Sequence, residues 1–176
     1  ELNFIEKKKN HIVVGAATSL REFELFIKKY YSDFNSILNR YGSVQIRNVG
    51  TIAGNIATAS PIGDTLPLLL SLDAKVVLQN LNKKTILPLK NFFISYRKTK
   101  LKKRQFIHSI IIPILKKNIF KAYKISKRID DDISSVCASF NIEIKNKKIK
   151  NIKIAYGGMA STPKRAINCE KILINK

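Results

Sequence analysis

The stretch from Tyr41 to Asp64 reads Y-G-S-V-Q-I-R-N-V-G-T-I-A-G-N-I-A-T-A-S-P-I-G-D, and its composition differs from that of the rest of the chain. The chain has 26 lysines among 176 residues, yet none of them falls in this stretch. Small residues and asparagine dominate, and no sustained helical or strand period is visible. One interpretation is a tightly packed turn region without room for long side chains. The other is a backbone that approaches a ligand closely, with Asn, Thr and Ser supplying uncharged hydrogen bonds.

The sequence on either side of this stretch predicts short strands and helices. Ser19 and Glu22 form a capping box, which indicates where the first helix begins. Asp33 is expected to cap the second helix, and Gly42 to end it. We expect strands at 11–15, 74–78, 85–89, 106–112, 120–125, 140–145 and 152–156, and helices at 20–30, 33–41, 67–72 and within 163–176.

The formal net charge of +21 raises the question of a nucleic-acid partner. Lysine outnumbers arginine 26 to 7, however, and the chain also contains 27 Ile and 15 Asn. Joint enrichment of Lys, Ile and Asn is typical of an A+T-rich coding sequence, and lysine lacks the bidentate recognition that arginine provides. We therefore interpret the charge partly as mutational drift and consider nucleic-acid binding unlikely.

The cysteine count and the apolar runs limit the class of protein further. Cys137 and Cys169 alone cannot build a disulfide-dense scaffold or a four-cysteine metal or iron–sulfur site. No apolar run approaches the roughly 20 residues that a membrane span needs. The first residues show neither an initiator Met nor a signal-peptide pattern, so we expect a cytoplasmic chain that is part of something longer.

Four segments carry a resemblance to a known family. Residues 45–67, which read Q-I-R-N-V-G-T-I-A-G-N-I-A-T-A-S-P-I-G-D-T-L-P, closely resemble the flavin-binding signature of the molybdenum hydroxylases, the group of xanthine dehydrogenase, aldehyde oxidase and carbon monoxide dehydrogenase. The segments S-Y-R-K-T at 95–99, Y-K-I-S-K-R-I-D-D-D-I-S at 123–134 and Y-G-G-M-A at 156–160 continue the match in order. Together they are most similar to the FAD-carrying small subunits of bacterial xanthine dehydrogenases.

This resemblance implies an α/β (α+β) fold in two units. Residues 1–113 would be the second subdomain of a PCMH-type FAD-binding domain, whose first subdomain, with its own Gly-rich loop, is missing. Residues 118–176 would be a partial C-terminal α+β domain like that of the carbon monoxide dehydrogenase flavoprotein. Ala53 and Gly54 stand where the family usually has two glycines.

The resemblance also implies which residues bind the cofactor. The loop that wraps the FAD pyrophosphate and ribitol matches five residues: Thr51, Gly54, Asn55, Thr58 and Ser60. Uncharged donors and exposed amides suit a diphosphate because several hydrogen bonds can share its charge.

Four further positions match residues around the ribitol and the flavin ring. Asp64 matches an acidic residue that accepts from cofactor hydroxyls, and Tyr41 matches an aromatic residue beside the isoalloxazine ring. Ile107 matches a backbone contact to that ring. Lys124 matches a cation near the flavin, where positive charge would stabilise the anionic reduced form.

Each of these residues also has a purely structural interpretation. Asp64 alone would more often be the N-cap of the helix that follows, and Tyr41 alone would more often belong to the core. The run Asp130 to Asp132 is interpreted as an electrostatic neighbour of the flavin, paired with Arg128, rather than as a metal site. His11 and His108 are expected to be structural, and Cys137 to be a buried thiol.

The function implied by the resemblance is the FAD step of a larger enzyme. FAD would accept electrons from iron–sulfur clusters and pass hydride to NAD, while xanthine or hypoxanthine is oxidised on a separate molybdopterin-binding subunit. No side chain of this chain is a strong candidate for acid–base catalysis. Two alternatives remain: a non-autonomous or decayed remnant of that subunit, and a basic nucleic-acid-binding module.

Overall fold

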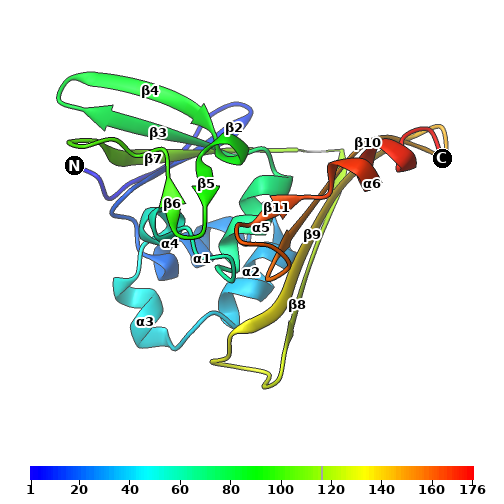
Figure 1. Ribbon diagram of the computed structural model, residues 1–176, viewed down its shortest axis with the longest axis horizontal. Helices are drawn as coiled ribbons and strands as arrows, with labels where there is room; N and C mark the ends of the chain where they lie inside the picture. Colours follow the sequence, from blue (N-terminus) through cyan, green and yellow to red (C-terminus); the bar gives the residue numbers. More distant parts are fainter. Residues whose placement is uncertain (116) are drawn as a thin grey trace.

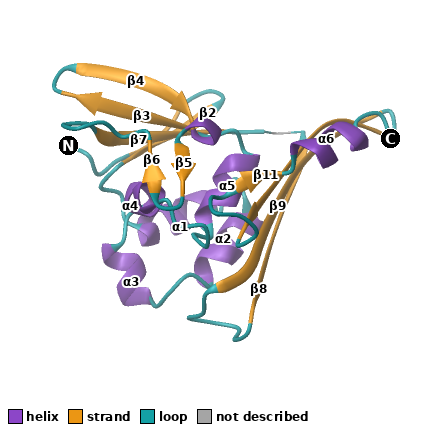
Figure 2. Ribbon diagram, in the orientation of Figure 1, coloured by secondary structure: helices purple, strands orange, loops and turns teal. Residues whose placement is uncertain are grey.

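The computed structural model describes residues 1–115 and 117–176, which form two large antiparallel sheets with helices in the angle between them (Figure 1). Figure 2 shows the same arrangement by type of element, with the helices gathered below the first sheet and beside the second. The expected α+β fold is confirmed. Among the described residues, no helix combines the length and apolar character needed to cross a membrane.

The first sheet has five strands in the order β1-β2-β7-β3-β4. Its strands are β1 (Ile5–Lys7), β2 (His11–Gly15), β3 (Lys75–Asn80), β4 (Lys83–Pro88) and β7 (Phe106–Pro113). The short strand β1 is absent from the sequence expectations, because three residues show no period. Ile12, Val14 and Ile110 are completely buried, which is the result of β-branched side chains alternating towards the helices.

The helices begin largely where their capping signals place them. Helix α1 (Leu20–Ile27) starts after Ser19, whose hydroxyl accepts from the Glu22 amide while the Glu22 carboxylate accepts from the Ser19 amide, so the capping box is confirmed. Those hydrogen bonds lower the pKa of Glu22. Helix α1 ends at Ile27, earlier than expected.

The expected role of Asp33 as a helix cap is wrong. Helix α2 (Ser32–Asn39) has Tyr31 at its N-cap position and no side-chain cap. The Asp33 carboxylate instead accepts from Lys121 Nζ at 3.3 Å and from the Ala122 amide at 3.3 Å. The Asp33 carboxylate therefore bonds to the strand that contains Ala122, 89 residues away, although the local pattern predicts a bond within its own helix.

The lysine-free stretch contains two short helices, which the sequence did not predict. Helix α3 (Val44–Val49) is capped by Ser43, and helix α4 (Ile52–Thr58) by Thr51. Each has fewer than two turns, so too few residues are present to show a helical period. Helix α5 (Thr65–Ser71) follows and is buried along its whole length.

A small ribbon lies between β4 and β7 in the chain. It consists of the 3₁₀ turn η1 (Leu89–Asn91) and the paired strands β5 (Phe93–Ser95) and β6 (Lys98–Thr99). Neither β5 nor β6 is among the predicted strands, because each is too short to show a period.

The second sheet has the order β11-β10-β9-β8. Its strands are β8 (Asn118–Ser126), β9 (Ser134–Lys145), β10 (Lys148–Gly157) and β11 (Lys164–Arg165), and helix α6 (Ile167–Leu173) follows. The three long strands and the final helix confirm the expectations for this half. Asn146 and Lys147 form the turn between β9 and β10, both with positive φ.

Helix α5 joins the two halves through buried polar contacts. Ser71 Oγ lies 2.6 Å from Ser139 Oγ, and Asn141 Nδ2 donates to the Ser71 carbonyl at 2.9 Å. Cys137, on the same strand, is buried as expected, and burial raises the pKa of its thiol. These contacts place the end of β8 and the start of β9 beside the lysine-free stretch.

Candidate functional site

A cleft of about 540 Å³ opens between the lysine-free stretch and the turn that connects β8 to β9. Helix α4, the loop from α4 to α5 and the residues before α3 form one wall. The end of β8 and the start of β9 form the other. Eight of the nine residues assigned by resemblance line this cleft: Tyr41, Thr51, Gly54, Asn55, Thr58, Ser60, Asp64 and Lys124.

Ile107 is the ninth residue, and it lies elsewhere. Its side chain is 5% exposed and packs in the core on β7. The cleft-lining residues do not include it.

The first turn of α4 is organised by Thr51. The Thr51 hydroxyl accepts from the Gly54 amide at 3.0 Å, which satisfies one of the free donors at the helix start. A Cβ added to Gly54 would meet that same hydroxyl oxygen at 3.0 Å. Ala53 is 6% exposed and belongs to the core, so its methyl group packs away from the cleft. A side chain at 54 would therefore have to displace the Thr51 hydroxyl by a few tenths of an ångström, whereas an alanine fits at 53.

Asn55 connects three elements through its amide group. Its Nδ2 donates to the Tyr41 hydroxyl at 2.8 Å, and its Oδ1 accepts from the Thr65 hydroxyl. The position of the Tyr41 ring is therefore fixed by a hydrogen bond as well as by packing. Burial, and secondarily the nearby Asp64 carboxylate, raise the pKa of Tyr41, so its hydroxyl stays protonated.

Asp64 and Lys124 form a buried ion pair between the two walls. Lys124 Nζ lies 2.7 Å from Asp64 Oδ2, and the two side chains are 2% and 4% exposed, respectively. Ser134 donates to the other carboxylate oxygen, and Lys124 also donates to the Asp132 carbonyl at 2.8 Å. Asp64 occupies the N-cap position of α5, but its side chain makes no capping hydrogen bond and is engaged by Lys124 and Ser134 instead.

The turn 127–133 is held against the cleft by Arg40 at the end of α2. Its guanidinium donates to the Ile129 carbonyl at 2.8 Å, the Lys124 carbonyl at 3.1 Å and the Ser126 hydroxyl at 3.2 Å. Within the turn, the Arg128 amide donates to the Asp132 carboxylate at 2.8 Å, and this bond is the main cause of the lowered pKa of Asp132. The expected pairing of Arg128 with the acidic run is confirmed for Asp132, at 3.7 Å.

Comparison with known protein families identifies the domain that contains this cleft. Residues 1–115 match the family described as the FAD binding domain in molybdopterin dehydrogenase. The chain belongs to this family. Residues 121–176 also match the CO dehydrogenase flavoprotein C-terminal domain.

Several proteins that are similar to this chain are much longer enzymes. The xanthine dehydrogenase of Emericella nidulans is 34% identical over 181 residues, which cover 95% of this chain and 13% of the relative. The xanthine dehydrogenase/oxidase of Gallus gallus is 32% identical over 177 residues, covering 92% and 13%. A nicotinate hydroxylase of Emericella nidulans is 41% identical over 131 residues, covering 71% and 10%. The chain spans about an eighth of the length of the xanthine dehydrogenases it matches.

Solved structures share the fold over nearly the whole chain. The cyanide-inactivated Cu,Mo-CO dehydrogenase superposes with a TM-score of 0.92 at 21% identity, covering 99% of this chain and 62% of that one. Quinoline 2-oxidoreductase from Pseudomonas putida 86 gives 0.89 at 19% identity, covering 99% and 61%.

The cleft of this FAD-binding domain suits an elongated cofactor with a flat ring and a polar chain. Its lining offers one aromatic ring at Tyr41 and uncharged hydroxyls at Thr51, Thr58 and Ser60. Its volume lies within the range of about 300–1,000 Å³ usual for small-molecule sites. The residues present therefore fit FAD. The positive charge of Lys124 is compensated by Asp64, and the charged side chains of Arg97, Asp131 and Asp132 also line the cleft.

Sequence reasoning missed several residues that build the cleft. Arg97 and Ser134 lie inside segments that carry the resemblance, but no role was assigned to either. Arg40 and Glu24 lie outside those segments, and Arg47 lies near the start of the first one. Arg47 and Glu24 form a buried ion pair at 3.1 Å. Arg47 Nη1 also donates to the Gly42 carbonyl at 2.6 Å, which fixes the turn before α3. The one available signal was that Arg47 is the single basic residue of the lysine-free stretch.

Proposed function

We propose that this chain is the FAD-binding portion of a molybdenum hydroxylase that resembles xanthine dehydrogenase. The observation that carries the proposal is the convergence of eight separately assigned residues on one cleft. These residues lie in helix α4, in strand β8 and in the three loops that precede α3, α4 and α5.

The residues of the cleft have distinct roles in this proposal. Thr51, Thr58 and Ser60 hold the pyrophosphate and ribitol through their hydroxyl groups, and Gly54, whose amide is bonded to the Thr51 hydroxyl, lets the cofactor approach the backbone closely. Tyr41, fixed by Asn55, lies beside the flavin ring. The Asp64–Lys124 pair presents both charges to the cofactor while keeping the two walls together, and the Ile107 backbone remains part of the proposed ring contact.

FAD, when bound, supplies the redox chemistry: it accepts electrons from iron–sulfur clusters and passes hydride to NAD during oxidation of a purine such as xanthine. The residues of this chain bind and orient the cofactor. The acidic turn 130–132 and Arg128 set the charge at the mouth of the cleft. Selection of the purine would belong to a molybdopterin-binding partner subunit.

We further propose that residues 1–113 and 118–176 are two units of a longer flavoprotein that acts in the cytoplasm. Because the chain spans an eighth of its xanthine dehydrogenase relatives, the iron–sulfur domain and the first FAD subdomain would be supplied by other segments or chains. The change from the first sheet to the second between Pro113 and Asn118 supports this division.

Titration of the chain with FAD tests the proposal. We expect flavin fluorescence to change on binding, with Thr58→Val combined with Ser60→Ala weakening binding about tenfold through loss of two hydroxyls. Thr85→Val combined with Ser95→Ala removes the same groups from exposed positions outside the cleft and should leave binding unchanged.

Two outcomes separate the alternatives. Binding that appears only after the family's first FAD subdomain is added would identify a non-autonomous fragment of the proposed flavoprotein. Absence of binding even with that subdomain would overturn the flavin assignment.

A further inference from the structure

A second hollow, of about 480 Å³, lies at the opposite ends of the elements that form the cleft. Helix α2 begins at this hollow with Ser32 and ends beside Tyr41. Strand β8 passes the hollow at Asn118 and Phe120 and reaches the cleft at Lys124. The two sites therefore share strand β8 but no lining residue. We call the second site the basic hollow.

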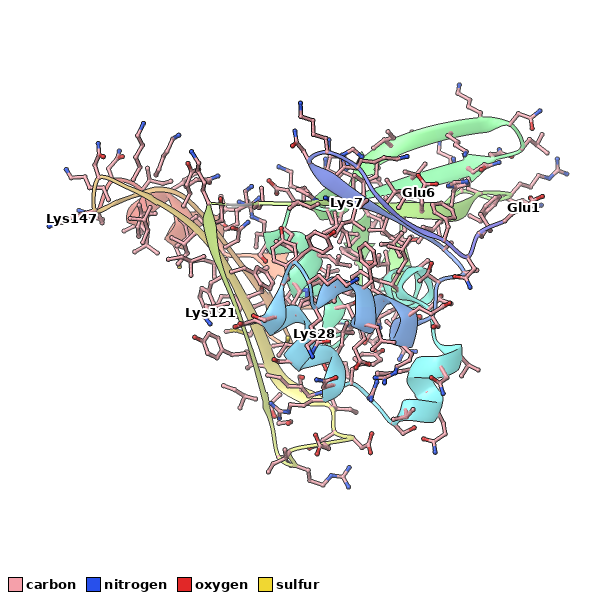
Figure 3. All side chains as sticks on the ribbon, turned by 180° about the vertical axis from the view of Figure 1, so that it is seen from behind. Glu1, Glu6, Lys7, Lys28, Lys121 and Lys147 are labelled. Atoms are coloured by element: carbon pink, nitrogen blue, oxygen red, sulfur yellow. The ribbon has the colours of Figure 1, made fainter. Side chains whose placement is uncertain are left out.

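The basic hollow collects positive charge from two separate elements. Lys7 and Lys9 come from β1 and the turn after it, and Lys29 follows helix α1. No carboxylate lines the hollow, and none of the three lysines forms an ion pair with another residue of the described ranges. Figure 3 looks onto this side of the molecule, with Lys7 above the helices and Lys121 on β8.

The two acidic residues next to lining residues in the chain, Glu6 and Asp33, are already engaged, and Glu6 pairs with Lys8 at 2.6 Å. Asp33, which follows Ser32 in the chain, pairs with Lys121 at 3.3 Å and accepts from the Ala122 amide. Its negative charge is therefore compensated by Lys121 on β8 and not by the three lysines of the hollow. An incoming anion would meet three ammonium groups without a competing carboxylate in the lining.

One wall of the basic hollow is aromatic and already in place. The Phe120 ring packs edge-on against Tyr31, with centroids 5.0 Å apart, and is half-buried. The Tyr31 hydroxyl donates to the Pro113 carbonyl at 2.7 Å and accepts from the Leu115 amide at 3.0 Å. These two bonds hold Pro113 and Leu115 in place beside the aromatic rings, so little ordering of these residues remains for ligand binding.

We propose that the basic hollow is a binding site for a small aromatic phosphate monoester, separate from the cofactor cleft. The three ammonium groups would receive the phosphate as point charges, and the Ser32 hydroxyl would turn from its 3.4 Å contact with Asp33 Oδ1 to add a donor. The aromatic and aliphatic wall of Tyr30, Phe120 and Leu115 would contact the ring of the ligand.

Phenyl phosphate is a suitable probe because it carries both features and is no fragment of FAD. In a titration of the isotope-labelled 176-residue chain followed by amide NMR at low salt, we expect saturable shifts at Tyr31, Ser32 and Asn118. The Gly54 amide in the cleft should not move. Phenol, which lacks the charge, and inorganic phosphate, which lacks the ring, should each bind about tenfold more weakly.

A charge-matched pair of variants separates the hollow from the general basicity of the chain. Lys7→Gln, Lys9→Gln and Lys29→Gln together should weaken binding of phenyl phosphate by about tenfold or more. Lys145→Gln, Lys147→Gln and Lys148→Gln remove equal charge from the exposed β9–β10 turn and should leave binding unchanged. FAD binding should be the same in both variants.

Three results would overturn the site. These are equal losses of affinity in the two triple variants, shifts in the wild-type chain centred on the cleft, and equal binding of phenyl phosphate and inorganic phosphate. The wild-type shift map needs no variant, so the proposal stays testable if the lysine substitutions impair folding.

Discussion

At the scale of single residues, a buried ion pair holds the two walls of the cleft together. The pair of Asp64 and Lys124 is nearly inaccessible to solvent, and each charge depends on the other for compensation. Removal of one partner would leave the other charged or force it to titrate inside the protein. The pair therefore helps to hold the two walls of the cleft together and also forms part of the proposed cofactor site.

Substitution of one member should cost more than substitution of both. We expect Asp64→Leu to lower the free energy of unfolding by about 3–5 kcal/mol, because Lys124 stays buried without its carboxylate. The double variant Asp64→Leu with Lys124→Met should recover most of that loss in urea denaturation. Equal stability of the single and double variants would show that the pair is not coupled.

His108 provides a pH-dependent test of the first sheet. Burial and the Lys84 ammonium group, 2.9 Å from its ring nitrogen, lower the pKa of His108 below the ordinary value of 6.5. A lowered folded-state pKa means that the neutral ring stabilises the folded chain above pH 6.5. That stability is lost as the pH falls through the folded-state pKa.

NMR titration of the His108 ring should show this shift directly. We expect Lys84→Gln to raise the pKa of His108 towards 6.5, and Lys83→Gln, an exposed neighbour, to leave it unchanged. A pKa of His108 at or above 6.5 in the unaltered chain would contradict the electrostatic reasoning.

At the scale of elements, the turn 127–133 depends on a residue from another part of the chain. Arg40 donates to Ile129, Lys124 and Ser126, which lie at or near the end of β8. A turn of this length has few buried apolar contacts of its own, so these hydrogen bonds hold its backbone against the cleft.

Loss of the guanidinium should therefore loosen the turn selectively. We expect Arg40→Met to speed amide hydrogen exchange at 127–133 by about tenfold, with exchange in the central strand β7 unchanged. Arg104→Met, which removes an exposed guanidinium from the loop before β7, serves as the control. Uniformly faster exchange over the whole chain would instead indicate general destabilisation.

At the scale of the whole molecule, α5 makes the two halves dependent on each other. Asn141 is 1% exposed, donates to the Ser71 carbonyl, and accepts from Asn118 Nδ2 at 2.9 Å. Its side chain thus connects the second sheet to a helix that packs beneath the first. Because these contacts are buried, the two halves should unfold together.

Asn141→Leu tests this cooperativity. We expect a loss of about 1–3 kcal/mol from the unsatisfied carbonyl and amide, with one coincident transition by circular dichroism and tyrosine fluorescence. Asn48→Leu on the exposed face of α3 should change stability by less than about 0.5 kcal/mol. Two separated transitions in the unaltered chain would show that the halves fold independently.

The local patterns of the sequence determined those features that depend on neighbouring residues. The Ser19–Glu22 box predicted the start of α1, and alternation predicted β9, because both signals are complete within a few residues. The motif from Thr51 to Ser60 likewise indicated one wall of the cleft. Helices α3 and α4 escaped prediction because neither is long enough to display a period.

Tertiary structure alone decided which partner each buried polar group takes. Asp33 and Asp64 both looked like helix caps, yet each carboxylate bonds to β8, 88 and 60 residues away. Arg40 at the cleft and the three lysines of the basic hollow carry no local signal at all. A buried charge bonds to whichever compatible group the fold brings near, and that proximity is a property of packing rather than of sequence spacing.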